Sequence, residues 1–374
     1  MPRAGACRAA LRRSLRWRQL PEGCRPEVVP APGERLPPLP GGSLGGLALD
    51  HFELRLGDGP QETVPMSVMR NPEMSGAPRP AVLFMHATGF CRASLWEWMQ
   101  SVVDAAGIVA VAVDARFHGQ RGVTRGRLSR ITSRQRYGYN DALVDAWRLG
   151  GERAGHPFLL DNVAEVPFVL DWISEQPFVD PERIGMTGIS LGGMHTWLAM
   201  VADDRIAVGA PLIGVQNWGW AVEHGRYHGR VASIPTVFEA ARADLGEDAV
   251  TAEVVRRVWD RILPGLLDVD GYDAAMSLPE LCPRPFLIVN GALDPRCPAE
   301  GLAAPAAAAA RRYAARGVEG NFAVSFEAGV GHAVTRSMYG KATAWLLAHL
   351  DSGEFGDLKG DLARGEALLA AGLR

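Results

Sequence analysis

A glycine-rich turn between a strand and a helix constrains this chain more than any other feature. Ile184 to Thr187 is a short apolar run typical of a buried strand, and Leu191 to Met200 is typical of a helix. Between them, Gly188, Ser190 and Gly192 have the spacing G-x-S-x-G. A serine on so tight a turn has strained backbone angles, and side chains two positions away on either side would clash. We therefore predict that this serine is presented at the carboxyl edge of a parallel sheet, on a nucleophile elbow.

Strand and helix patterns alternate on both sides of this turn. The alternation predicts an α/β protein with a mostly parallel sheet covered by helices on both faces. The predicted strands span 51–56, 63–70, 80–86, 108–114, 184–187, 206–213, 285–290 and 321–327. The predicted helices span 94–106, 162–174, 191–200 and 337–350, with one more through the alanine run 303–310 to about 315. Residues 123 to about 139 are polar and rich in arginine, and we expect an extended surface loop there.

The alternation is interrupted between residues 214 and 281. This segment has few strand-like runs and several amphipathic helical ones, such as Val237 to Leu245 and Glu253 to Ile262. We predict a helical lid, inserted between two late strands of the sheet. The folded domain is then expected to span 47–350.

The two ends of the chain differ from this pattern. Residues 1–46 comprise a basic leader followed by a linker rich in proline and glycine, and we expect them to be disordered. The first 20 residues carry six arginines and no acidic residue, which resembles a mitochondrial or plastid transit peptide. The alternative is a basic leader without an address, on a cytoplasmic protein. Residues 351–374 form a charged tail.

The composition excludes other classes of function. A net charge of −3 and a pI near 6.3 give no electrostatic basis for binding nucleic acid. No apolar stretch reaches the roughly 20 residues needed to span a bilayer. The five cysteines are odd in number and lack the spacing of metal ligands. We therefore predict an intracellular, reducing compartment, no disulfide framework and no bound metal.

A serine hydroxyl needs a general base, and the base needs a group that orients it. In this architecture the acid and then the histidine follow the serine, each in a loop directly after a strand. Asp294 and His332 occupy these two places. We predict that Ser190 attacks, that His332 transfers the proton, and that Asp294 orients the imidazole. Asp268 and Asp270 are weaker candidates for the acid because they fall inside the predicted lid.

Two backbone amides are expected to form the oxyanion hole. One is the N–H of Leu191, at the start of the helix after the nucleophile. The other is expected from the loop that follows the strand ending at His86. We favour Thr88 for this second donor, with Ala87 and Gly89 as alternatives.

These motifs resemble those of the α/β-hydrolase superfamily. The resemblance rests on His86-Ala-Thr-Gly, Asp114-Ala-Arg-Phe-His-Gly119, Gly188-Ile-Ser-Leu-Gly-Gly193 and Asn290-Gly-Ala-Leu-Asp-Pro295. It is nearest to the branch of prolyl-oligopeptidase-like (S9-like) peptidases, acetyl xylan esterases and dienelactone-hydrolase-like proteins, and to a group of uncharacterised plant-type α/β-hydrolases. It covers roughly residues 52–350 and implies a serine hydrolase that uses no cofactor.

Two departures from that pattern matter. Ala87 replaces the glycine of the common His-Gly-x loop, which bears on the geometry of the oxyanion hole. Ser190 replaces the cysteine of true dienelactone hydrolases, so the resemblance does not imply that activity.

The aromatic residues of the predicted lid are candidates for the substrate pocket. Trp218, Trp220 and Tyr227, together with Phe90, are suited to an apolar acyl pocket. The alternative is that the two tryptophans pack the lid onto the body of the domain. No cluster of arginines in the sequence requires a phosphate or carboxylate on the substrate.

We expect a serine carboxylesterase that acts on small or medium esters through an acyl-enzyme. The alternatives are a peptidase or amidase, an acyltransferase, and a ligand receptor with slow or no turnover. The sequence does not indicate an oligomeric state.

Overall fold

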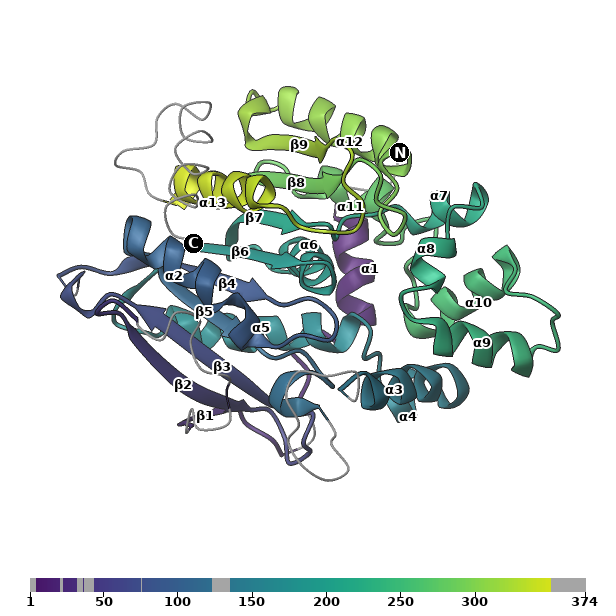
Figure 1. Cartoon of the computed structure of the whole chain (residues 1–374), viewed down its shortest axis with the longest axis horizontal. Coiled ribbons are helices and arrows are strands. Elements are labelled where there is room, and N and C mark those ends of the chain that lie inside the picture. The colour runs from purple at the N-terminus through teal and green to yellow at the C-terminus, as the bar shows by residue number, and fades with distance from the viewer. Residues whose placement is uncertain are drawn as a thin grey trace.

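The computed structural model describes residues 5–20, 23–31, 36, 44–74, 76–122 and 135–350. Within these residues one sheet has the strand order β1-β2-β3-β5-β4-β6-β7-β8-β9 (Figure 1). The strands from β5 to β9 in this order pair in parallel, and β1, β2 and β3 pair antiparallel. Their bounds are β1 Glu27–Pro30, β2 Ala48–Arg55, β3 Thr63–Arg70, β4 Arg79–Met85, β5 Val109–Val113, β6 Val179–Ile189, β7 Ile206–Leu212, β8 Phe286–Gly291 and β9 Phe322–Glu327.

Helices cover both faces of the sheet, so its central strands are apolar on both sides. Along β4, Leu83 and Met85 belong to one hydrophobic core, whereas Val82 and Phe84 belong to the other. The first and larger core, the main core, lies under α5 (Leu160–Ser174) and α6 (Leu191–Ala202). The second core lies under α2 (Trp96–Ala106) and α13 (Arg336–Leu350) (Figure 1). Burial on both faces is what the continuous apolar runs in the sequence require. The predicted fold class is confirmed.

The other helices connect these elements or precede them. Their bounds are α1 Ala6–Ser14, α3 Gln135–Leu149, α4 Gly151–Ala154 and α12 Ala299–Ala314, with 3₁₀ turns η1 Pro72–Met74, η2 Arg92–Leu95, η3 Gly119–Arg121 and η4 Glu319–Asn321. The alanine run lies within α12, which packs on β9.

A helical insertion separates β7 from β8. Residues 214–281 are described throughout and contain α7 Trp218–Glu223, α8 His228–Val231, α9 Pro235–Asp244, α10 Ala252–Ile262 and α11 Ala274–Glu280. Helices α7 to α10 lie together beyond the right-hand end of the sheet in Figure 1, and α11 packs on α12. Since α7 follows β7 directly, these helices stand at the carboxyl edge of the parallel strands.

The structure corrects the prediction that residues 1–46 are disordered. Residues 6–14 form α1, and residues 27–30 form β1, which pairs with β2. The side chains of Cys7, Leu11 and Leu15 are buried in the main core. Residues 1–4 of the leader and residues 21–22, 32–35 and 37–43 of the expected linker lie outside the described residues.

Two of the arginines that suggested a transit peptide bind the body of the domain. Arg8 Nε and Arg12 Nε donate to the carbonyl oxygens of Val201 and Ala202, at 2.9 and 2.8 Å. These carbonyls belong to the last turn of α6, where acceptors lack intrahelical donors and positive charge is favoured. Arg8 and Arg12 therefore have a structural role in docking α1, which the sequence pattern alone did not reveal.

The structure corrects the end of the predicted surface loop, because residues 135–139 belong to a helix. Helix α3 begins at Gln135, and residues 123–134 lie outside the described residues, as does the C-terminal tail 351–374. Helix α3 packs on α9 and α10, and buries Tyr139, Leu143 and Ala146. The start of this helix was not predicted because the stretch is polar and only a narrow stripe of the helix is apolar.

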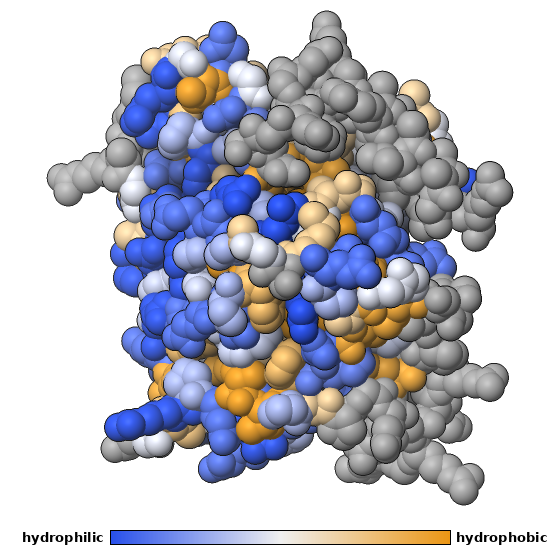
Figure 2. All heavy atoms as spheres, turned by 90° about the vertical axis from the view of Figure 1, so that its left-hand side faces the viewer, coloured by the Kyte–Doolittle hydropathy of each residue, from blue (hydrophilic) through white to orange (hydrophobic). Residues whose placement is uncertain are grey.

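Figure 2 shows the side that lies on the left in Figure 1, away from α7 to α10. Over the coloured part of this face, hydrophilic residues predominate and hydrophobic residues form small separate groups. No helix in the described part of the chain is long and apolar enough to cross a membrane. The carboxyl ends of the parallel strands meet at the opposite end of the sheet, which is where ligands bind in open α/β sheets.

Candidate active site

Ser190 lies on the turn that joins β6 to α6. Its backbone has φ 54° and ψ −105°, a strained conformation for any residue with a side chain. A Cβ atom on Gly188 would lie 2.6 Å from the carbonyl carbon of Gly192, and one on Gly192 would overlap the carbonyl oxygen of Met85. The two glycines therefore allow the strand and the helix to approach closely enough to hold the serine in this conformation.

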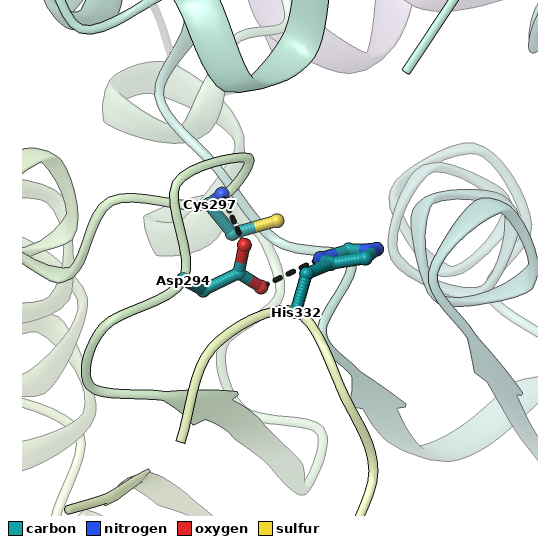
Figure 3. A group of neighbouring side chains, drawn as sticks. All are labelled: Asp294, Cys297 and His332. Atoms are coloured by element: carbon teal, nitrogen blue, oxygen red, sulfur yellow. Dashed lines mark hydrogen bonds and ion pairs between the residues drawn. The ribbon is translucent and has the colours of Figure 1, made fainter. Parts of the chain in front are cut away.

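The side chains of Ser190, His332 and Asp294 form a hydrogen-bonded chain. Ser190 Oγ is 2.8 Å from His332 Nε2, and His332 Nδ1 is 2.7 Å from Asp294 Oδ2. The aspartate follows β8 and the histidine follows β9, so neighbouring parallel strands bring both loops to the same edge (Figure 3). Because Nδ1 donates to the carboxylate, Nε2 is left to accept the serine proton.

Backbone donors hold the carboxylate of Asp294 in place. The N–H groups of Arg296 and Cys297 donate to Oδ1 at 2.8 and 3.2 Å, which leaves Oδ2 for the histidine. Burial raises the pKa of this carboxyl, but the hydrogen bond and charge of His332 and these two N–H donors outweigh it and hold the pKa below its ordinary value. Asp294 is therefore ionised at neutral pH.

His332 is neutral at the same pH. Burial lowers its pKa below the ordinary value, the contact with Asp294 opposes that shift, and the charges of Arg230 and Arg296 add to it. The side chain is 11% exposed. A neutral, partly accessible imidazole is suited to accept a proton.

Three other histidines near the sheet are fully enclosed. His86, His118 and His195 are at most 1% exposed. Burial lowers the pKa of all three, to about 3 for His118 and His195. His332 thus differs from them in both its accessibility and its partners.

The loop after β4 forms a tight turn. The N–H of Phe90 donates to the carbonyl of Ala87 at 3.1 Å, and Gly89 has φ 82°, as a type II turn requires. No described residue accepts a hydrogen bond from the N–H of Thr88. Leu191 is the first residue of α6 and has no intrahelical acceptor for its N–H. Both predicted oxyanion donors therefore lie at the ends of adjacent strands, β4 and β6.

His86 braces one side of this loop. Its Nε2 accepts from the N–H of Ala115 at 3.0 Å, so its Nδ1 carries the proton and donates to the carbonyl of Ala87 at 2.9 Å. A structural role for His86, bracing the loop, is what we predict from the sequence, and these two bonds support that role.

An ion pair braces the other side of the loop. Arg92 and Asp114 are 1% and 0% exposed and are joined by a direct salt bridge. The N–H of Arg92 also donates to Asp114 Oδ1 at 2.8 Å, and its Nε donates to Ser67 Oγ at 2.9 Å. Arg92 was missed from the sequence because its partner lies 22 residues away on the next strand.

The predicted pocket residues have different environments. Phe90 is 49% exposed, next to the oxyanion loop. Trp218 is only 2% exposed and stacks on Trp197 with ring centroids 5.4 Å apart, so it packs the insertion onto the body. Trp220 is half-buried against the start of α12, and Tyr227 is half-buried against the main core.

Asp294, Cys297 and His332 are close enough to suggest a metal site. One potential ligand atom from each lies within 4.8 Å of the others (Figure 3). The aspartate and the histidine bond to each other, however, and Cys297 Sγ donates to the carbonyl of Ile213 at 3.4 Å. Burial raises the pKa of this thiol, which keeps it protonated. These bonds account for the closeness of the three groups.

Comparison with known proteins defines the fold. No protein-family model and no curated protein matches this chain. Among solved structures, the methylesterase BT1017 is similar over 98% of this chain and 68% of its own, with a TM-score of 0.63 and 16% identity. Acetyl xylan esterase 1 from Thermoanaerobacterium sp. JW/SL YS485 is similar over 93% of this chain and 98% of its own, with a TM-score of 0.59 and 14% identity. The chain has the α/β-hydrolase fold.

The same α/β-hydrolase fold also occurs in a peptidase. The acylaminoacyl peptidase from Pyrococcus horikoshii has a TM-score of 0.54 and 15% identity, over 85% of this chain and 44% of its own. Esterases and peptidases are thus both among the solved structures with this fold. Since one fold supports many activities, the activity of this protein has to be argued from its own site.

Proposed function

We propose that this protein is a serine hydrolase whose substrates are small or medium carboxylic esters. The hydrogen-bonded chain from Ser190 through His332 to Asp294 supports the proposal more than any other observation. It contains a nucleophile, a neutral base and an ionised acid in the order that acyl transfer needs.

The first half of the proposed reaction forms an acyl-enzyme. His332 Nε2 takes the proton of Ser190 Oγ as this oxygen attacks the ester carbonyl carbon, and Asp294 stabilises the resulting imidazolium. The N–H groups of Leu191 and Thr88 donate to the oxyanion of the tetrahedral intermediate. When the intermediate collapses, the C–O bond to the alcohol breaks and the alcohol leaves with the proton from His332.

The second half hydrolyses the acyl-enzyme. His332 takes a proton from water, and the water oxygen attacks the acyl carbon. The new intermediate collapses, Ser190 Oγ recovers the proton from His332, and the carboxylic acid is released. No redox step occurs, and the chain's own residues supply every proton transfer.

We also propose that helices α7 to α10 act as the lid of this site. Helix α8 packs directly on the loop that carries Asp294. The contact is so close that a Cβ atom on Gly229 would overlap the carbonyl oxygen of Pro295. A movement of α8 would therefore displace Pro295, the residue that follows Asp294. This contact supports a lid that orders the site as well as covering it.

Hydrolysis of a chromogenic series tests the proposal. Wild type should hydrolyse p-nitrophenyl esters between acetate and octanoate, with an optimum that reports the size of the acyl site. Ser190→Ala should lose this activity by about 10³-fold or more. Ser174→Ala, at the end of α5, is the matched control and should keep it. Faster cleavage of the matching p-nitroanilides would replace the esterase by an amidase, and a folded wild type that turns over neither series would favour a ligand receptor.

A further inference from the structure

The buried guanidinium of Arg230 has no carboxylate partner among the described residues. The side chain lies in α8 and is 5% exposed. Its Nε donates to Gln216 Oε1 at 3.3 Å, and its Nη2 contacts Cys297 Sγ at 3.8 Å. Within the described part of the chain, no acceptor takes a hydrogen bond from Nη1.

The other buried arginines have a different environment. Three arginines are classed as buried in the described part of the chain, and two of them pair with a buried carboxylate. Arg92 pairs with Asp114, and Arg121 pairs with Glu165. Burial of a charge is costly unless an opposite charge and hydrogen bonds compensate for it. Only Arg230 has a neutral amide and a thiol in their place.

Arg230 lies beside the proposed reaction centre. Its Nη2 contacts Cys297 Sγ. This sulfur lies within 4.8 Å of a carboxylate oxygen of Asp294 and of a ring nitrogen of His332. Its positive charge also helps to lower the pKa of His332. The close contact between Gly229 and the acid loop holds α8 in this place.

We propose that Arg230 binds a carboxylate of the substrate, so that the ester hydrolysed at Ser190 carries a negative charge. This inference rests on the proposed function and adds a substrate class to it. The carboxylate would accept from Nη1 of Arg230. Charge-assisted bonds of this kind are stronger than bonds between neutral groups, and they supply the charge compensation that the buried guanidinium lacks.

Matched substrate pairs test the proposal on either side of the scissile bond. In one pair the acyl group carries the charge: mono-4-nitrophenyl glutarate and its methyl ester. In the other pair the leaving group carries it: 3-acetoxybenzoate and its methyl ester. Wild type should prefer the charged member of at least one pair in kcat/KM. Arg230→Met should reduce that ratio by about 10- to 100-fold, and Arg230→Lys by less.

A nearby exposed arginine provides the control. Arg226 pairs with Glu300 at 3.3 Å, and both side chains are more than half exposed. Arg226→Met should leave the charged-to-neutral ratio unchanged. The ratio is taken within one protein, so a smaller fraction of folded enzyme does not alter it. If Arg230→Met does not fold, Arg230→Lys still tests whether the guanidinium geometry is needed. Lysine keeps the positive charge but lacks the planar fork of N–H donors.

A binding measurement separates failure of this inference from failure of the proposed function. Ser190→Ala should bind 3-acetoxybenzoate or the free glutarate half-ester more tightly than the neutral partner, and Ser190→Ala with Arg230→Met should lose the difference. This readout needs no turnover. Equal binding of charged and neutral members, or a preference that survives Arg230→Met, would overturn the role of Arg230. Absence of Ser190-dependent hydrolysis in wild type would instead overturn the proposed function.

Discussion

The carboxylate of Asp294 accepts a hydrogen bond from Nδ1 of His332 at 2.7 Å while two backbone N–H groups hold its other oxygen. This arrangement selects the histidine tautomer whose Nε2 faces Ser190 Oγ, 2.8 Å away. The protein thus orients the proposed base before any substrate binds, which is the condition for efficient proton transfer.

Asp294→Asn should remove this orientation. The amide can donate to Nδ1 and so stabilise the wrong tautomer, and kcat should fall by about 10³- to 10⁴-fold with little change in KM. Asp268→Asn is the control, because Asp268 is exposed in the insertion. Steady-state kinetics on a p-nitrophenyl ester measures both variants. Equal activity of Asp294→Asn and wild type would show that another residue orients the base.

The pH profile of kcat/KM should follow the ionisation of His332. Its pKa lies below the ordinary value because burial disfavours the charged form more than Asp294 favours it. The base works when neutral, so activity should persist at pH 6.5 and fall only at lower pH. Arg230→Met removes a nearby positive charge, which raises the pKa of His332 and should move the acidic limb to higher pH. A limb that moves to lower pH, or does not move, would contradict the placement of Arg230.

Helix α1 should contribute to the stability of the domain. Leu11 is fully buried in the main core, so Leu11→Ala should destabilise the protein by about 2 to 5 kcal/mol. Arg13→Ala, on the exposed side of the same helix, should change stability by less than about 0.5 kcal/mol. Denaturant unfolding of the two variants measures the difference. If both resemble wild type, α1 is not part of the cooperative unit.

Asp273 joins two helices of the insertion. It accepts from the N–H of Ala274 at 2.7 Å, at the start of α11, and from those of Gly219 and Trp218 at 2.8 and 3.1 Å, at the start of α7. Asp273→Ala leaves these donors buried and should cost about 2 to 4 kcal/mol.

The pKa of Asp273 supplies a second readout. Burial raises this pKa to about 6, even though the three N–H donors lower it. A raised carboxyl pKa means that its contribution to stability is greatest below the unfolded value and is lost as pH rises towards 6. That part of the pH dependence should be absent from Asp273→Ala and present in the exposed control Asp270→Ala. Identical pH dependence in both variants would assign it to other groups.

The parts of the fold and of the site that could be predicted depend on short, local sequence patterns. The end of β6 at Ile189, the turn at Ser190 and the start of α6 at Leu191 are each encoded within a few residues. The acid and the histidine were found because each follows a buried strand directly, and parallel strands place such loops at one edge. The hydrogen-bonded geometry then came from the fold.

Contacts between distant residues explain what the sequence did not reveal. Arg8 lies 193 residues from its acceptor on α6. The composition of the segment around Arg8 therefore suggested a leader and not a docked helix. Arg230 lies 67 residues from the thiol it contacts, and nothing in the local pattern of α8 indicates that this arginine is buried. Trp218 is aromatic and follows a strand, but its stacking on Trp197 depends on how the insertion folds back.

Mass spectrometry of the protein after reaction with a fluorophosphonate tests the central claim most directly. The account predicts one modified peptide, with the phosphonyl group on Ser190, in wild type and in the control Ser174→Ala. Ser190→Ala should not be modified, although circular dichroism should show that it is folded. Modification at a different serine, or no modification of folded wild type, would contradict the assignment of Ser190 as an activated nucleophile.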